Sequence, residues 1–361
     1  MGAAKTATTY IQHGLFNNTE LLAEHGVYLP KAGRFQFSKK SVVHHNLGWE
    51  LLGEQRYKAE AGGWEALTEE LKSVDAETVI ISSESLERMS YSSQRRSLLE
   101  DRLKGLSADV TVIYAVRDQL SSLNSLYTQS IKSFRTHQSF SHFVAHQLTS
   151  GHFDFNRCFN SWYESDVLKL VAVPFSALVA QDPLVGFLAA AGVDVPADRL
   201  VLKSVPSNVS PGPIAVEAAK LLGQYLLAVD PRFKTTSNRG RRLYRLAALR
   251  ARENGWCEDK YWGWTHEEAE RTAFELEDGN RRFAEAMWGP EVSLELPLDR
   301  PTAAARLLGL DPKTFKDVQI YVDQLVQRYL ELRTGQTYLP TDSTLSGLSV
   351  KQLGDDEDID A

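Results

Sequence analysis

The residues with the clearest chemical potential stand at the start of the chain, where Lys5, Thr6, Thr8 and Thr9 follow a short run of small residues. The apolar spacing directly after them predicts a helix that begins inside this segment. The first N–H groups of a helix have no partners within it and lie at the positive end of its dipole. With the charge of the lysine and the threonine hydroxyls, they predict a cradle for a phosphate or sulfate group. The alternative is an ordinary solvated helix cap.

This cradle differs from the Walker A loop of proteins that bind nucleoside triphosphates. That loop needs a glycine further upstream and another glycine directly before its lysine. Ala4 occupies the second of these positions here. The departure weakens an assignment to the nucleoside triphosphate-binding proteins.

Three side chains further along the chain could act on protons. His44 and His45 stand near the start of a predicted helix over 41–52, and Glu84 follows an apolar run over 78–81 that predicts a buried parallel strand. Ligands bind at the carboxyl ends of parallel strands, which places Glu84 near the cradle. A carboxylate or a neutral imidazole there can serve as a general base. The alternatives are histidines that cap or line a packed helix, and a carboxylate that satisfies helix amides.

A second buried strand is predicted from Val110, and it ends in Arg117. Ser125 follows on the helix predicted after this strand. A guanidinium offers a planar fork to a phosphate, and a serine hydroxyl on the next helix adds a donor. This pair therefore predicts a second site for a phosphate, although a lone arginine after a strand is more often a surface residue.

In their order and context, these segments resemble the sulfotransferases that use 3′-phosphoadenosine 5′-phosphosulfate (PAPS). In that family a small-x-x-Lys-Thr-Gly-Thr-Thr loop binds the 5′-phosphosulfate, and Ala7 stands here at the glycine position. In the same family, a strand that ends in arginine and a serine eight residues later bind the 3′-phosphate. Arg117 and Ser125 have this spacing. The resemblance implies an α/β fold of three α/β/α layers with a central parallel sheet, similar to the P-loop nucleotide hydrolases.

The resemblance also implies an activity with PAPS as cosubstrate and without a metal. A hydroxyl or amine of a small-molecule or glycan acceptor would attack sulfur in line while the nucleotide phosphate leaves. The implied cofactor-binding residues are Lys5, Thr6, Ala7, Thr8, Thr9, Arg117 and Ser125, and the implied catalytic residues are Lys5, Glu84, His44 and His45. Lys5 would neutralise the leaving phosphate, and Glu84 is the first choice of base.

Two other functions stay open. A P-loop phosphotransferase or kinase would share the fold, but it needs a magnesium-binding aspartate after a strand, for which Asp118 is the only candidate. A catalytically inactive nucleotide-binding protein would keep Arg117 and Ser125 without turnover. The aromatic cluster within 256–264 could stack on sugar rings of a carbohydrate-like acceptor, or it could anchor a loop to the core.

The organisation of the chain is predicted as a sulfotransferase domain over 1–295 and a helical extension over 296–361 that ends in an acidic, disordered tail. A third buried strand is predicted over 167–175. Members of the family carry a further strand directly before the phosphosulfate loop. Met1 leaves no room for it, which indicates either a misassigned start or, if the chain is complete, a central sheet that lacks its first strand.

The bulk composition limits the classes of protein. The chain has 361 residues, 43% of them hydrophobic, and a net charge of −7, which argues against nucleic acid as a partner. Cys158 and Cys257 form neither a disulfide framework nor a zinc motif, which favours a reducing cytoplasm. No apolar run is long enough to predict a membrane span.

Overall fold

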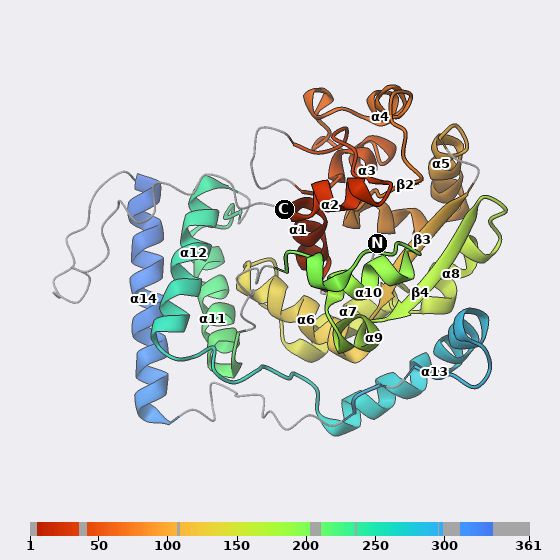
Figure 1. The fold of residues 1–361 in the computed structure, drawn as a ribbon. Coiled ribbons are helices and arrows are strands. Elements are labelled where there is room, and N and C mark those ends of the chain that lie inside the picture. The colour runs from red at the N-terminus through yellow and green to blue at the C-terminus, as the bar shows by residue number, and fades with distance from the viewer. Residues whose placement is uncertain are drawn as a thin grey trace.

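The computed structural model of the chain describes residues 6–35, 42–106, 109–202, 211–234, 237–294, 296–298 and 311–334. Lys5 and the acidic tail lie outside these residues. The described chain is an α/β structure in which helices outnumber strands (Figure 1). No described helix is both long enough and apolar enough to cross a bilayer.

The strands form two parallel pairs. In one pair β1 (Val27–Tyr28) lies beside β2 (Thr78–Val79). In the other, β3 (Val110–Val116) lies beside β4 (Leu168–Pro174) over seven residues in register. The branched, apolar composition of β3 and β4 suits strands covered on both sides. The strands predicted around 110–116 and 167–175 are therefore confirmed.

The single central sheet expected from the sequence is not formed within the described residues, because the two pairs are separate. The ladder of β2 ends early because of a contact with His44. Ile80 N still donates to Tyr28 O at 3.0 Å, but the backbone of Ser82 then exchanges hydrogen bonds with His44. The prediction of a fully buried strand over 78–81 is also wrong at Val79, whose side chain is exposed.

Helices connect and cover the strands. Those before β3 are α1 (Thr8–Asn17), α2 (Thr19–Glu24), α3 (His45–Leu51), α4 (Trp64–Leu71) and α5 (Ser93–Leu103), with the 3₁₀ helices η1 (Ala59–Ala61) and η2 (Glu84–Tyr91). Between β3 and β4 lie α6 (Gln119–Lys132), α7 (Phe140–Thr149) and α8 (Phe155–Tyr163). After β4 come α9 (Phe175–Ala180), α10 (Pro183–Ala190), η3 (Ala197–Arg199), α11 (Pro213–Val229), α12 (Asn238–Glu253), α13 (His266–Trp288) and α14 (Pro312–Thr334).

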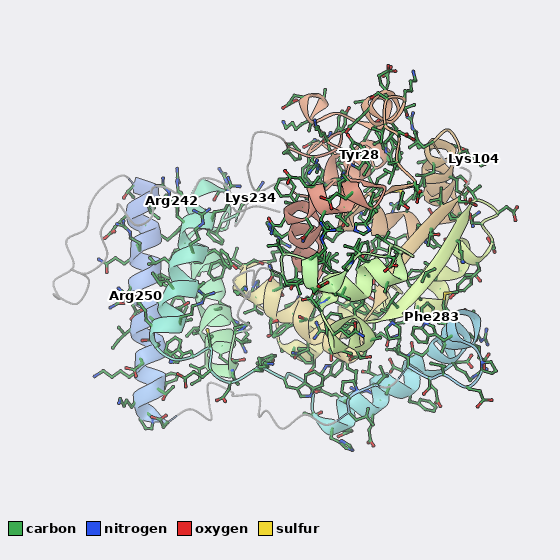
Figure 2. The ribbon with its side chains drawn as sticks, in the orientation of Figure 1. Tyr28, Lys104, Lys234, Arg242, Arg250 and Phe283 are labelled. Atoms are coloured by element: carbon green, nitrogen blue, oxygen red, sulfur yellow. The ribbon has the colours of Figure 1, made fainter. Side chains whose placement is uncertain are left out.

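One apolar core surrounds β3 and β4, and aromatic rings of α8 and α13 close it. Phe283 on α13 is completely buried, with its ring 5.3 Å from Phe155 and 5.5 Å from Phe159 between centroids (Figure 2). It also meets the ring of Trp288 edge to face. This long helix is therefore fixed to the strand core through its C-terminal half.

A second core joins α6 and α7 to α11, α12 and α14. The last three helices lie side by side in Figure 1. Tyr329 of α14 donates to the Asp230 carboxylate at 2.6 Å, and Tyr321 donates to Ala247 O at 3.2 Å. Trp264 is buried here as well, and its Nε1 donates to Leu120 O at 3.0 Å. Of the two roles weighed for the aromatic cluster within 256–264, the structure shows the anchoring of a loop to the core.

Candidate functional site

The helix α1 begins after a residue that cannot cap it. Ala7, the N-cap residue, has left-handed backbone angles, with φ 58° and ψ 18°, and its side chain makes no capping hydrogen bond. The first turn contains no acidic residue. Thr6 is buried, Thr8 is half-buried and Thr9 is exposed. The segment predicted as an anion cradle thus begins a helix that carries no competing carboxylate of its own.

Replacing Ala7 by glycine should stabilise the protein. A left-handed conformation costs a residue with a Cβ about 1 to 2 kcal/mol, and the greater freedom of glycine in the unfolded chain offsets part of this. We expect the free energy of unfolding of Ala7→Gly, measured by urea titration, to rise by about 0.5 to 1 kcal/mol. Ala23→Gly, at an exposed position inside α2, is the matched control and should destabilise. Destabilisation by both variants would contradict the assignment of strain to Ala7.

Glu84 lies beside this helix, at the start of η2. The side chains of Thr8 and Gln12, on successive turns of α1, lie close enough to lower the pKa of its carboxyl group through hydrogen bonding. Its Oε2 atom is 3.4 Å from Nε2 of His45, the first residue of α3. Three segments that are distant in sequence therefore meet at one carboxylate.

The two ionisable groups of this contact influence each other. Burial raises the pKa of Glu84, but His45 and the hydrogen bonds from Thr8 and Gln12 together hold it below the ordinary value. Burial lowers the pKa of His45 more than the neighbouring Glu84 raises it. At neutral pH the site accordingly holds a carboxylate beside a neutral imidazole, and either group can accept a proton.

The His45 ring is held on both sides. Nδ1 lies 3.1 Å from Ser83 Oγ, and the ring stacks on Trp49 with centroids 5.4 Å apart. Ser85 Oγ donates to His45 O at 3.1 Å, which ties α3 to η2. A Cβ at Gly48 would stand only 2.2 Å from Ser85 Oγ, so glycine is required for this approach. The imidazole is therefore fixed in position rather than free to rotate.

His44, the other predicted histidine, is placed differently. Nδ1 accepts from Ser82 N at 3.1 Å, so Nε2 carries the proton and donates to Pro30 O at 3.0 Å. Burial lowers its pKa to about 4. Both ring nitrogens are thus occupied by backbone groups near the ends of β1 and β2. This geometry favours a structural role for His44 and leaves the base to Glu84 or His45.

The neutral state of His44 should make stability depend on pH. Its pKa is about 4 in the folded protein and near 6.5 when unfolded, so the unfolded chain takes up the proton first as the pH falls. From pH 7.5 to 5 the wild type should therefore lose about 2 kcal/mol more unfolding free energy than His44→Gln. Urea titrations of both proteins at the two pH values measure this difference. Equal losses would show that His44 titrates normally in the fold.

Arg117 and Ser125 are presented as their sequence context predicted. Arg117 directly follows β3, and its guanidinium lies over the ring of Phe175, 5.3 Å from the centroid. Ser125 is half-buried on α6. Asp118, the candidate magnesium ligand, instead caps α6, accepting from Ser121 N at 2.7 Å. Within the described residues, no group of three His, Cys, Asp or Glu side chains is placed to hold a metal ion.

Gln12 and Ser83 also belong to the site, and the sequence analysis missed both. Gln12 is almost completely buried on α1, where it bonds Glu84 and donates to Ser82 Oγ at 3.3 Å. Its spacing of four residues from Thr8 places both on one helix face, and that was the available signal. Nothing in the sequence pattern indicated that Ser83 would contact His45.

Comparison with known proteins gave no relatives: no family model matches the chain, and neither the curated proteins nor the solved structures contain a match.

Proposed function

We propose that this chain is a PAPS-dependent sulfotransferase that transfers a sulfuryl group to a hydroxyl or amine of a small-molecule or glycan acceptor. The assignment to the three-layer sulfotransferase fold is part of the proposal. The observation that carries it is the position of Glu84 beside the first turn of α1, where Thr8 acts on its carboxyl group and His45 Nε2 lies 3.4 Å from Oε2. It puts a proton acceptor next to a helix N-terminus suited to a phosphosulfate.

The proposed reaction is a single displacement. The 5′-phosphosulfate lies against the first turn of α1, with Lys5, Thr6, Ala7, Thr8 and Thr9 as its binding residues. The acceptor oxygen or nitrogen forms a bond to sulfur while the bond from sulfur to the phosphate oxygen breaks. The acceptor proton passes to the base, and the electron pair of the broken bond stays on the phosphate. Lys5 and the helix amides stabilise this leaving phosphate, a role commonly worth about 3 kcal/mol per donor.

Solvent exposure separates the roles of Glu84 and His45. The Glu84 side chain is 33% exposed and that of His45 is 13% exposed. Oε2 of Glu84 is itself buried against the imidazole. We therefore assign Glu84 as the group that receives the acceptor proton and His45 as the residue that positions it. Arg117 and Ser125 are assigned to the 3′-phosphate of the nucleotide.

Calorimetric titration with 3′-phosphoadenosine 5′-phosphate, in buffer containing EDTA, tests the nucleotide site. We expect saturable binding that weakens by about 10- to 100-fold in Arg117→Ala, because hydrogen bonds to charged groups contribute about 1.5 to 3 kcal/mol. Lys5→Ala should weaken it similarly. Arg102→Ala, at an exposed position on α5, is the matched control and should bind as the wild type does.

The possible outcomes separate the functions weighed above. Absence of binding by the folded wild type would contradict the proposal. Binding without sulfuryl transfer from PAPS to any acceptor of a broad panel would point to an inactive nucleotide-binding protein. A requirement for magnesium and turnover of a nucleoside triphosphate would point to a phosphotransferase.

A further inference from the structure

We infer that the acceptor carries an anionic group, a carboxylate or a sulfate ester, which Arg34 binds beside the reacting centre. This inference rests on the proposed function. It starts from the guanidinium of Arg34, whose Nε atom is buried and donates to no described residue. A buried donor without a partner destabilises the fold, so its retention points to a ligand that supplies the acceptor.

Arg34 forms no ion pair within the described structure, although the charge of the nearby Glu70 favours its protonated form. The nearby carboxylate of Glu70 is already occupied, since its oxygens accept from Tyr28 OH at 2.6 Å and from the amides of Lys31 and Ala32 at 2.7 and 2.8 Å. On another side the guanidinium meets the ring of Phe16, 5.6 Å from its centroid. The cation therefore retains the capacity to bind an external anion.

A small hollow lies against this guanidinium. Its volume is about 10 Å³, enough for a single oxygen atom. Polar groups of its wall come from Gln12, His44 and Ser82, and apolar side chains supply the remainder. A carboxylate or sulfate oxygen in this hollow would lie beside Arg34, with the side chains of Gln12 and Ser82 in the same wall.

Gln12 connects the hollow to the reacting centre. Its side chain lines the hollow, donates to Ser82 Oγ at 3.3 Å and hydrogen-bonds to Glu84. One side chain therefore separates the Arg34 site from the proposed base. An acceptor whose anionic group lies on Arg34 would present an adjacent hydroxyl or amine to Glu84. Arg34 is thus a residue that determines acceptor specificity and takes no part in proton transfer.

The direct test is binding of small probes, followed through the Nε–Hε resonances of arginine-labelled protein by NMR. The probes are acetate, methyl sulfate and the neutral acetamide, at constant ionic strength set with sodium chloride. The Arg34 resonance is assigned by its loss in Arg34→Lys. We expect it to shift saturably with acetate or methyl sulfate and not with acetamide, and the stronger of the two anions identifies the group on the acceptor. Arg102 is the internal control and should not shift.

The result that overturns the inference is an Arg34 resonance that does not move with either anion, or that moves equally with chloride. Arg34→Met should abolish the thermal stabilisation that acetate or methyl sulfate gives the wild type. It should leave the affinity for 3′-phosphoadenosine 5′-phosphate within about two-fold of the wild type. Loss of nucleotide binding in the wild type would instead count against the proposed function, while the probe titration would still report on Arg34. The two failures are thereby distinguishable.

Discussion

Glu84→Gln is expected to lower the rate of sulfuryl transfer by about 100- to 10,000-fold, the usual contribution of a general base. The amide has nearly the same shape as the carboxylate but cannot accept the acceptor proton. The affinity for 3′-phosphoadenosine 5′-phosphate should stay near that of the wild type, because Arg117 and the helix amides are untouched. Transfer of labelled sulfate from PAPS, with calorimetry on the same samples, measures both quantities.

Glu69→Gln is the control for this variant, since Glu69 lies exposed on α4 in an ion pair with Lys72. The pKa of Glu84 is held below its ordinary value, so the wild-type rate should not decline through protonation of this group between pH 8 and 6. A rate in Glu84→Gln within two-fold of the wild type would remove Glu84 from the mechanism. Attention would then move to His45, whose pKa is lowered by burial.

Phe283→Ala is expected to reduce the free energy of unfolding by about 3 to 5 kcal/mol, the cost of a large cavity in a packed core. Its ring is completely buried between α8 and the end of α13. Phe274→Ala on the same helix is the matched control, because the Phe274 side chain is 78% exposed and its removal should change stability by less than about 0.5 kcal/mol. Urea titrations measure both variants. Equal effects would mean that α13 does not pack on the strand core.

Much of this architecture could be predicted from the sequence, because long apolar runs and helix caps depend on residues that are neighbours in the chain. The branched, apolar run over 110–116 predicted a buried strand, and β3 occupies these residues. β2 was overestimated because its length depends on a distant partner. His44 forms hydrogen bonds with the backbone of Ser82, and no local sequence pattern indicates such a contact.

In the candidate site, too, some contacts could be predicted from the sequence and others could not. Glu84 and Thr8 could be brought together by the rule that ligands bind at the carboxyl ends of strands. The sequence could not show which of the two adjacent histidines lies beside Glu84. That depends on the packed structure, in which His44 contacts Pro30 and His45 contacts Glu84. Arg34 gave no signal in the sequence. Its interest comes from a buried atom without a partner, which is a property of the packed structure alone.

The position of α14 in the second core has a consequence for synthesis of the protein. Tyr329 meets Asp230, and Tyr321 meets the backbone of Ala247, so α14 closes a core whose other helices are made much earlier. Chains lengthen at about 5 to 20 residues per second. The apolar faces of α11 and α12 must therefore wait several seconds on the ribosome before their last partner emerges. A stop codon placed before α14 would leave these faces without that partner, and we expect the shortened chain to aggregate.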